Sequence, residues 1–315
     1  MDLTALSDDA LPYSRVANIE RRKGTSWLID SLWLENAAGI IGGQPKCCKS
    51  WLGIDMAVSV ASGTACLGKF HVSTPGPTLV YLAEDAIEAV RSRVDSICKS
   101  RGLSIESLDL VVITAHILRL DDESDRKRLW STVEKLRPRL LLLDPLVRLH
   151  RLDENNARDI AGLLGFLREI QRKANCAVVL THHASKRSCS RPGQGLRGTS
   201  DLHAFGDSNL YLSRNDDLIE LATEHRSAAA QAPVHLRLTG EDGATHLAIA
   251  DNGAAPTHVS LDQRIVGLLA NARTAIPRTE LREKLRTNNQ RLGRALATLL
   301  ASGQIAASPA GISLA

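Results

Sequence analysis

The fold of this chain is decided by the stretch Ala38-Gly-Ile-Ile-Gly-Gly-Gln-Pro-Lys-Cys-Cys-Lys-Ser50. It opens with a short apolar run that predicts a buried strand, and apolar residues at helical spacing follow over residues 51–61. A glycine-containing turn between a strand and a helix, ending in Lys-Ser, is the pattern of a phosphate-binding loop. Backbone N–H groups at the helix N-terminus bind the anion there, and the helix dipole adds to the attraction.

The residues that we assign to nucleotide binding form one continuous stretch. They are Gly43, Gln44, Pro45, Lys46, Cys47, Cys48, Lys49 and Ser50. In such a loop the Lys49 amine reaches the β- and γ-phosphates of ATP, and the Ser50 hydroxyl binds Mg²⁺. Cys48 stands where the pattern has its last glycine, so its side chain is expected to crowd the loop or alter its backbone angles. The N–H donors and the neighbouring lysines also predict a stabilised thiolate at Cys47 or Cys48.

Apolar runs alternate with amphipathic stretches through the middle of the chain. Further strands are predicted at residues 78–83, 110–114, 140–143 and 177–181, and helices at 87–98, 127–136 and 160–173. Strands separated by helices of this length imply right-handed crossovers and a parallel sheet, with helices on both faces. Antiparallel strands at one edge are predicted from shorter runs at residues 209–212, 218–223, 234–238 and 245–250.

Polar residues follow the predicted strands. Asp144 ends the run 140–143, and Glu84 ends the run 78–83. These strand ends lie at one edge of a parallel sheet, where such sheets bind ligands. We therefore expect Asp144 to bind Mg²⁺ and Glu84 to activate water as a general base, while Asp85 caps the next helix. The neighbours His182 and His183 should point to opposite faces of their strand, which argues against a shared metal ion.

The end of the chain forms a separate unit in our interpretation. Helical periodicity covers residues 261–270, 278–285 and 289–302, and residues 305–314 can form a hairpin. This set predicts a winged helix-turn-helix domain. We divide the chain into an N-terminal segment (1–24), an α/β domain (25–250), a linker (251–258) and the winged helix (259–315). DNA contacts are expected from Asn288, Asn289, Arg291 and Arg294, although winged helices also dock proteins.

Composition sets wider limits. The 315 residues are 43% hydrophobic and 23% charged, an ordinary globular balance, and with 3% aromatic residues the core must be built from Leu, Ile, Val and Ala. The net charge of +4 permits a polyanionic partner without requiring one. The sequence shows no signal peptide and no apolar stretch of about 18 residues, so we expect a cytoplasmic protein that does not enter a membrane. The six cysteines lack metal-ligand spacing and are expected to be reduced thiols.

Taken together, these residues resemble the RepA-like branch of RecA-fold P-loop ATPases, AAA family proteins of plasmids and mobile elements that include hexameric replicative helicases. The resemblance covers about residues 25–250. Besides the phosphate loop it rests on Trp27-Leu-Ile-Asp-Ser-Leu32, Leu82-Ala-Glu-Asp85, Leu143-Asp-Pro-Leu146, Asp153-Glu-Asn-Asn156, His182-His-Ala-Ser-Lys186 and Leu196-Arg-Gly-Thr-Ser200.

The resemblance implies roles for particular residues. Glu84 matches the catalytic glutamate, Asp144 the magnesium-site aspartate and His183 the γ-phosphate sensor of the family. Arg197 matches an arginine finger that reaches the neighbouring subunit's nucleotide, and Arg226 is a second candidate for acting in trans. The segment 186–195 lies where the family has a mobile loop facing the central channel. Its Lys186, Arg187 and Arg191 suit contact with DNA phosphates.

We therefore expect an ATP-hydrolysing, DNA-associated motor or loader that works as an oligomer with ATP and Mg²⁺. A replicative helicase or an accessory ATPase of replication or transposition fits this description, as a hexameric ring on single-stranded or duplex DNA. The alternative is a nucleotide-dependent assembly switch with little or no hydrolysis, which docks a protein partner through its winged helix. Cys48 favours the switch, whereas Glu84 and Arg197 favour the motor. A transcriptional regulator would need an effector pocket, which the sequence does not reveal.

Overall fold

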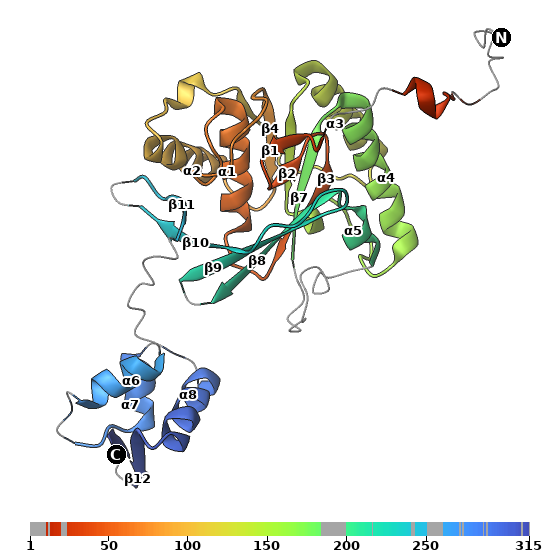
Figure 1. Ribbon diagram of the computed structural model, residues 1–315. Coiled ribbons are helices and arrows are strands. Elements are labelled where there is room, and N and C mark those ends of the chain that lie inside the picture. The colour runs from red at the N-terminus through yellow and green to blue at the C-terminus, as the bar shows by residue number, and fades with distance from the viewer. Residues whose placement is uncertain are drawn as a thin grey trace. The chain divides into compact units, whose positions relative to one another are not determined.

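The chain forms two compact units, residues 1–250 and 251–315, in the computed structural model (Figure 1). The described residues are 11, 13–19, 24–183, 200–215, 217–240, 243–250, 261–270, 272, 274–285, 287, 289–309 and 311–314, with the backbone alone at 200, 263, 290 and 291. The expected linker, residues 251–258, lies wholly outside the described residues.

A large sheet organises the first unit. Its strands are β3 (Ala38–Gly43), β4 (Thr78–Leu82), β5 (Leu110–Val112), β6 (Leu140–Asp144), β7 (Ala177–His183), β8 (Ser208–Asn215), β9 (Leu218–His225), β10 (Val234–Thr239) and β11 (His246–Ile249). Their order in space is β11-β10-β9-β8-β3-β7-β6-β4-β5. The strands from β8 to β5 are parallel, and β9, β10 and β11 extend the sheet antiparallel. The predicted mostly parallel sheet is confirmed.

One strand differs from its predicted pairing. The run at 209–212 was expected among the antiparallel strands, but β8 pairs in parallel with β3 and places Leu212 opposite Gly43. It then turns into an antiparallel hairpin with β9. The sequence contains a turn signal between β8 and β9, which predicts their antiparallel pairing. It contains no signal for the pairing of β8 with β3, the strand before the phosphate loop.

Helices cover both faces of this sheet (Figure 1). They are α1 (Lys49–Ser62), α2 (Ile87–Ser100), α3 (Glu123–Leu136), α4 (Ala157–Ala174) and α5 (Ser200–Phe205). Leu140 and Leu142 of β6 belong to the core on the α1 and α2 side, and Leu141 and Leu143 to the core on the α3, α4 and α5 side. The continuous apolar run of β6 follows from this burial on both faces.

Two helices begin earlier than predicted, at residues 123 and 157 instead of 127 and 160. Asp122 caps α3 by accepting a hydrogen bond from the Asp125 N–H, and Asn156 caps α4 by accepting one from the Arg158 N–H. The first turns are polar and therefore carry no apolar periodicity, but their capping residues satisfy free N–H groups of the helix.

The sequence analysis missed a short hairpin ahead of the sheet, made of β1 (Trp27–Ile29) and β2 (Trp33–Leu34). Trp33 is fully buried, and its indole N–H donates to the Ala37 carbonyl at 3.2 Å. The short 3-10 turns η1 (Val16–Asn18), η2 (Ile105–Ser107) and η3 (Leu146–Arg148) were missed as well. These elements are too short to show a period.

The second unit contains α6 (Leu261–Ala270), α7 (Arg278–Lys284), α8 (Asn289–Ala301) and a hairpin of β12 (Ile305–Ser308) and β13 (Gly311–Leu314). Leu281, Leu292 and Ile312 lie in its separate core. Gly311 has φ 136°, and a Cβ there would lie 2.7 Å from the Ile276 carbonyl group, so the hairpin requires glycine at this position. Among the described residues of both units, no helix is long and apolar enough to cross a membrane.

Candidate nucleotide-binding site

A cavity of about 280 Å³ lies at the carboxyl ends of the central parallel strands. Its lining residues are Lys46, Cys48, Lys49, Ser50, Trp51, Glu84, Arg93, Asp144, Pro145 and His183. Strand register explains why they meet: Leu82 of β4 lies opposite Asp144 of β6, and Gly43 of β3 lies opposite His183 of β7. The structure therefore brings the phosphate loop together with Glu84, Asp144 and His183.

The phosphate loop joins β3 to α1 through two residues with positive φ. Lys46 has φ 65°, and Cys48, the N-cap of α1, has φ 67° and ψ 28°. This left-handed conformation favours glycine and costs another L-residue about 1–2 kcal/mol. Cys48 therefore occupies a conformation that suits glycine, and the backbone strain is stored in the loop itself.

The two loop cysteines are not the activated thiols that their neighbours predict. Burial raises the pKa of the Cys47 thiol, and Lys49 lowers it by less. Burial likewise raises the pKa of Cys48, against smaller lowering effects of Arg214, Lys49 and Arg93. The expected stabilised thiolate is wrong for this structure because desolvation outweighs the nearby positive charges. Cys47 also packs so closely that a Cβ on Gly43 would lie 2.6 Å from its Sγ.

Lys49 lies folded across the loop. Its side chain is buried, and Nζ donates to the Gly43 carbonyl at 3.0 Å and to the Gln44 carbonyl at 2.9 Å. These two carbonyls are neutral acceptors, and phosphate oxygens, which carry charge, can replace them. The amine is thus held at the edge of the cavity by contacts that a stronger acceptor can displace.

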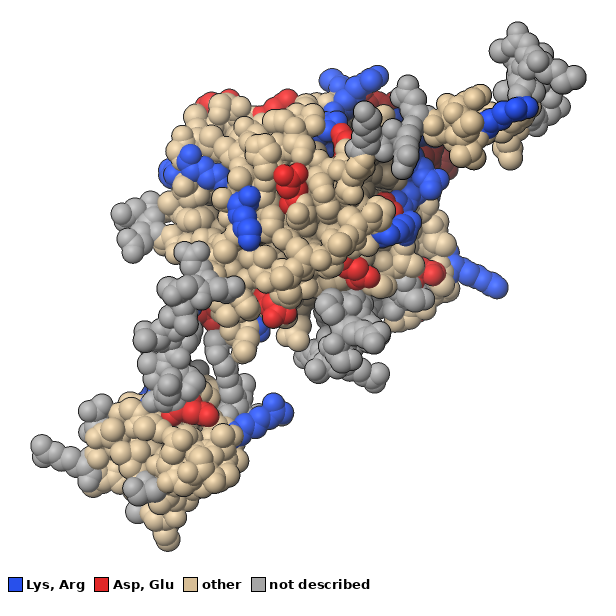
Figure 2. Space-filling model, in the orientation of Figure 1, with Lys and Arg blue, Asp and Glu red and all other residues tan. Residues whose placement is uncertain are grey.

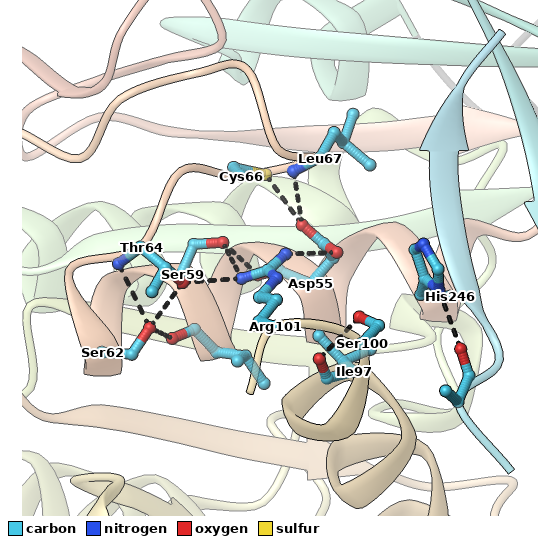
Figure 3. A network of polar contacts seen from close by, with 12 residues as sticks. Asp55, Ser59, Ser62, Thr64, Cys66, Leu67, Ile97, Ser100, Arg101 and His246 are labelled. Atoms are coloured by element: carbon cyan, nitrogen blue, oxygen red, sulfur yellow. Dashed lines mark hydrogen bonds and ion pairs between the residues drawn. The ribbon is translucent and has the colours of Figure 1, made fainter. Parts of the chain in front are cut away.

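The helix that presents Lys49 is anchored by a buried polar network (Figure 3). Asp55 of α1 accepts from Arg101 Nη2 at 2.6 Å and from the Leu67 N–H at 2.9 Å. Arg101 Nη1 also donates to the Ser59 and Thr64 hydroxyls at 2.9 and 3.0 Å. The Asp55 carboxylate is 1% exposed, so Arg101 compensates a buried charge. The network ties α1 to the end of α2 and to the loop after α1.

Asp144 offers a carboxylate suited to a hard cation. It is buried, Thr181 donates to its Oδ1, and no described residue donates to the buried Oδ2. Burial raises the pKa of this carboxyl, and the nearby Ser50 and Thr181 hydroxyls lower it. A buried carboxylate oxygen without a protein donor, close to a serine hydroxyl, fits the oxygen coordination that Mg²⁺ prefers. Thr181 was missed as a site residue because a threonine within an apolar strand is an ordinary strand residue.

Glu84 lies at the rim of the cavity, and Arg148 Nε donates to its Oε1 at 2.7 Å. Asp85 does not cap α2, contrary to our expectation. Ala86 is the N-cap, and Asp85 instead accepts two hydrogen bonds from Arg93, at 2.6 and 2.9 Å. Arg93, in the second turn of the helix, competes for the carboxylate that would otherwise cap it.

The adjacent histidines point to different surroundings, as predicted. His183 lines the cavity. His182 is buried, with Nδ1 at 3.7 Å from Glu154 Oε1, which also lies 3.6 Å from His150 Nε2. Within the described ranges, no group of three or more ligand side chains is arranged to hold a metal ion.

Arg226 lies away from this cavity. It pairs with Asp207 at 3.1 Å and donates to the Ala204 carbonyl. It lines a second cavity, of about 590 Å³, together with Ala37 and Asn175, which precede β3 and β7. That cavity is therefore at the amino-terminal edge of the sheet, opposite the phosphate loop.

Several predicted residues cannot be placed. Lys186, Arg187, Arg191, Arg197 and Asn288 lie outside the described residues, as does the side chain of Arg291. Asn289 and Arg294 are exposed on α8.

Arg214 is a residue beside the loop that sequence reasoning missed. It lies near the end of β8, and its Nη1 donates to the Lys46 carbonyl at 3.1 Å. Because β8 pairs with β3, the end of β8 lies next to the phosphate loop. The sequence carries no signal of this contact.

Comparison with known proteins agrees with this geometry. A family model described as AAA domain (AAA_25) matches residues 11–188 of this chain. Among solved structures, the chain is similar to a DnaB-like replicative helicase described with its interactions with primase, at 15% identity and a TM-score of 0.52. The match covers 67% of this chain and 57% of the helicase chain. It is also similar to the RadB recombinase, at 16% identity and a TM-score of 0.50, over 69% of this chain and 92% of that one.

At such identities the solved structures show the fold alone, and the finer resemblance to the RepA-like branch stays a prediction. The family match extends over more than half of the chain, from residue 11 to residue 188 of 315. The protein therefore belongs to the AAA domain family, with the RecA-like P-loop fold of these two proteins.

Proposed function

We propose that this chain is a RepA-like ATPase, which binds ATP with Mg²⁺ in the 280 Å³ cavity and hydrolyses it as part of a DNA-associated oligomer. One observation carries the proposal: a single cavity beside the phosphate loop is lined by Lys49 and Ser50 of α1, by Glu84 after β4, and by Asp144 and His183 at the ends of β6 and β7.

In this proposal the loop N–H groups and Lys49 bind the β- and γ-phosphates. The Lys49 ammonium exchanges the Gly43 and Gln44 carbonyls for phosphate oxygens, which are the stronger acceptors. The Ser50 hydroxyl and Asp144 Oδ2 would hold Mg²⁺. When bound, this ion neutralises charge on the phosphate oxygens.

Glu84 acts as the general base. Its carboxylate takes a proton from a water molecule as the water oxygen attacks the γ-phosphorus and the bond to the ADP oxygen breaks. His183 contacts the γ-phosphate from the end of β7 and couples its presence to the chain that follows. Arg197 completes the site of a neighbouring subunit by stabilising the charge that develops in the transition state. Arg226 is the weaker candidate for this role because Asp207 and the Ala204 carbonyl already bind it within its own subunit.

DNA association rests on three observations of different kinds. The two solved structures are a replicative helicase and a recombinase. The segment with Lys186, Arg187 and Arg191 is basic, and the second unit has the three helices and hairpin expected of a winged helix, with Asn289 and Arg294 exposed. Acidic and basic side chains are interspersed on the face of the larger unit drawn in Figure 2, so that face offers no extended basic surface. We propose that these two segments contact DNA and that the chain acts as part of a cytoplasmic, hexameric ring.

The assembly switch stays the second candidate, because Cys48 holds a strained conformation in the loop and Arg148 binds the proposed general base. In that case ATP binding would order the chain for a protein partner at the winged helix, with little turnover. Steady-state ATP hydrolysis, with and without single-stranded DNA, separates the two candidates.

Two variants test the site directly. Lys49→Ala should abolish nucleotide binding, measured by titration with a fluorescent ATP analogue, because the loop loses the buried ammonium that bonds the Gly43 and Gln44 carbonyls. Glu84→Gln should bind the analogue as the parent does and lose hydrolysis, since only the base is removed. Unchanged binding by Lys49→Ala would overturn the site, and hydrolysis at the parent's rate by Glu84→Gln would move the base elsewhere.

A further inference from the structure

The proposed general base is held by an arginine that sequence reasoning did not single out. Arg148 Nε donates to Glu84 Oε1 at 2.7 Å. Glu84 follows β4, and Arg148 lies in η3, directly after β6. These strands are neighbours, with Leu82 opposite Asp144, so the two side chains extend from adjacent points of the same sheet edge.

The backbone of Arg148 is fixed. Its N–H donates to the Pro145 carbonyl at 3.0 Å, and its own carbonyl accepts from the Arg119 guanidinium. The Leu149 N–H closes the same short turn by donating to the Leu146 carbonyl at 2.9 Å. The turn therefore attaches Arg148 firmly to the strand that ends in Asp144, and Glu84 is held against this anchor.

Arg148 acts on the reaction through Glu84 and not through the phosphates. Glu84 lines the nucleotide cavity, whereas Arg148 is not among the described residues that line it. Its guanidinium side chain is 60% exposed and the Glu84 side chain 45% exposed, so solvent reaches the pair from the rim. The hydrogen bond from the guanidinium occupies one of the two carboxylate oxygens and fixes the position of the side chain. The carboxylate therefore has to leave this contact before that oxygen can accept a proton from water.

We propose that Arg148 is a positioning residue that keeps Glu84 in a resting position, from which the carboxylate must be released before it can take a proton from the attacking water. This inference rests on the proposed ATPase function and adds a restraint that the function does not require. It predicts that the free chain hydrolyses ATP more slowly than the assembled one for a reason that lies within the subunit, in addition to the arginine supplied by a neighbour. Assembly then acts by freeing Glu84, so the restraint lowers the basal rate more than the stimulated rate.

The exposed position of the pair bounds the effect. Exposed ion pairs contribute up to about 1 kcal/mol. If this free energy has to be supplied before the reaction, it slows the rate by a factor of up to about five. Arg148→Met, which keeps the length of the side chain without its charge, should raise the basal kcat by about two- to five-fold. Nucleotide affinity and Tm should stay unchanged because Arg148 neither lines the cavity nor is buried. Arg148→Lys, which restores a cation, should return the rate towards that of the parent.

The experiment compares the full-length variants in steady-state ATP hydrolysis at saturating ATP, with a fluorescent ATP analogue to measure binding. Arg151→Met is the matched control, since Arg151 is exposed and lies outside the cavity. The double variant Arg148→Met, Glu84→Gln should be inactive, because the gained rate passes through Glu84.

An Arg148→Met enzyme that is no faster than the parent, or slower, overturns the inference while leaving the proposed function intact. A gain equal to that of Arg151→Met also overturns it. The proposed function fails in a different way: neither parent nor Arg148→Met hydrolyses ATP under any condition, or Lys49→Ala still binds nucleotide, and both outcomes remove the basis of the inference as well.

Discussion

Substituting Cys48 with valine, alanine or glycine should separate the effect of backbone conformation from that of the thiol. Cys48 begins α1 with φ 67° and ψ 28°, and its side chain is half-buried beside the nucleotide cavity. Glycine adopts this conformation without strain, alanine with the same strain as cysteine, and a β-branched residue only as an outlier. Nucleotide binding should therefore survive in Cys48→Gly and Cys48→Ala and fail or weaken strongly in Cys48→Val.

The magnitudes follow from the geometry of this one residue. Glycine removes about 1–2 kcal/mol of left-handed strain from the folded state. It also destabilises the folded state by roughly 0.5–1 kcal/mol, because the unfolded chain gains conformational entropy. The lost contacts of the half-buried thiol offset most of the remainder, so the free energy of unfolding should change by less than about 1 kcal/mol, or about 2–4 °C in Tm. Valine adds about 1–3 kcal/mol of strain. If the loop keeps its conformation, this strain lowers Tm by about 2–12 °C. If the loop instead rearranges, the Kd for ATP rises about tenfold for each 1.4 kcal/mol of binding free energy that is lost.

Thermal unfolding and titration with a fluorescent ATP analogue measure both quantities, with Cys48→Ala as the control for loss of the thiol. We also expect Cys48→Gly to turn over ATP at least as fast as the parent, since glycine suits the loop's backbone. Valine binding ATP as tightly as cysteine, with an unchanged Tm, would refute the reasoning, because the left-handed conformation would then not be required. A Cys48→Gly enzyme slower than the parent would show that the thiol itself assists the loop.

Two further predictions concern the surroundings of the loop. Arg101→Met should destabilise the protein by about 3–5 kcal/mol, because Asp55 stays buried without its counter-charge. Calorimetry should show a Tm lower by about 6–20 °C. A decrease in Tm no larger than that of the control Lys127→Met, at an exposed lysine, would contradict the network of Figure 3. Burial raises the pKa of Cys48, so brief alkylation and peptide mapping should find slow labelling at pH 7 that increases as the pH rises through 9, with protection by ATP. Labelling at pH 7 faster than that of a free cysteine would mean that the loop stabilises the thiolate after all.

The sequence by itself determined the candidate nucleotide site in outline, because each of its parts has a local cause. A strand, a short polar turn and a helix are visible around Lys49 and Ser50 as a change of apolar period. The run that ends in Asp144 is apolar on both faces, which already indicates a strand inside a parallel sheet. Carboxyl ends of parallel strands share one edge, so the meeting of Glu84, Asp144 and His183 followed from strand order alone.

Only the tertiary structure decided which side chains pair around that site. Arg148 bonds Glu84 across 64 positions of sequence, and Arg214 reaches the Lys46 carbonyl across 168. No local pattern marks such partners, because arginines on helices, turns and strand ends are ordinary surface residues until the register of the sheet places them. The same holds for Cys48. The sequence shows the lysines beside its thiol, but not the burial that raises the pKa of that thiol. This burial and the left-handed backbone of Cys48 appear only in the folded chain, where β3, α1 and β8 pack together. The periodicity of apolar residues specifies helices and strands, whereas the burial of side chains, the pairing of charges and backbone strain depend on how these elements pack together.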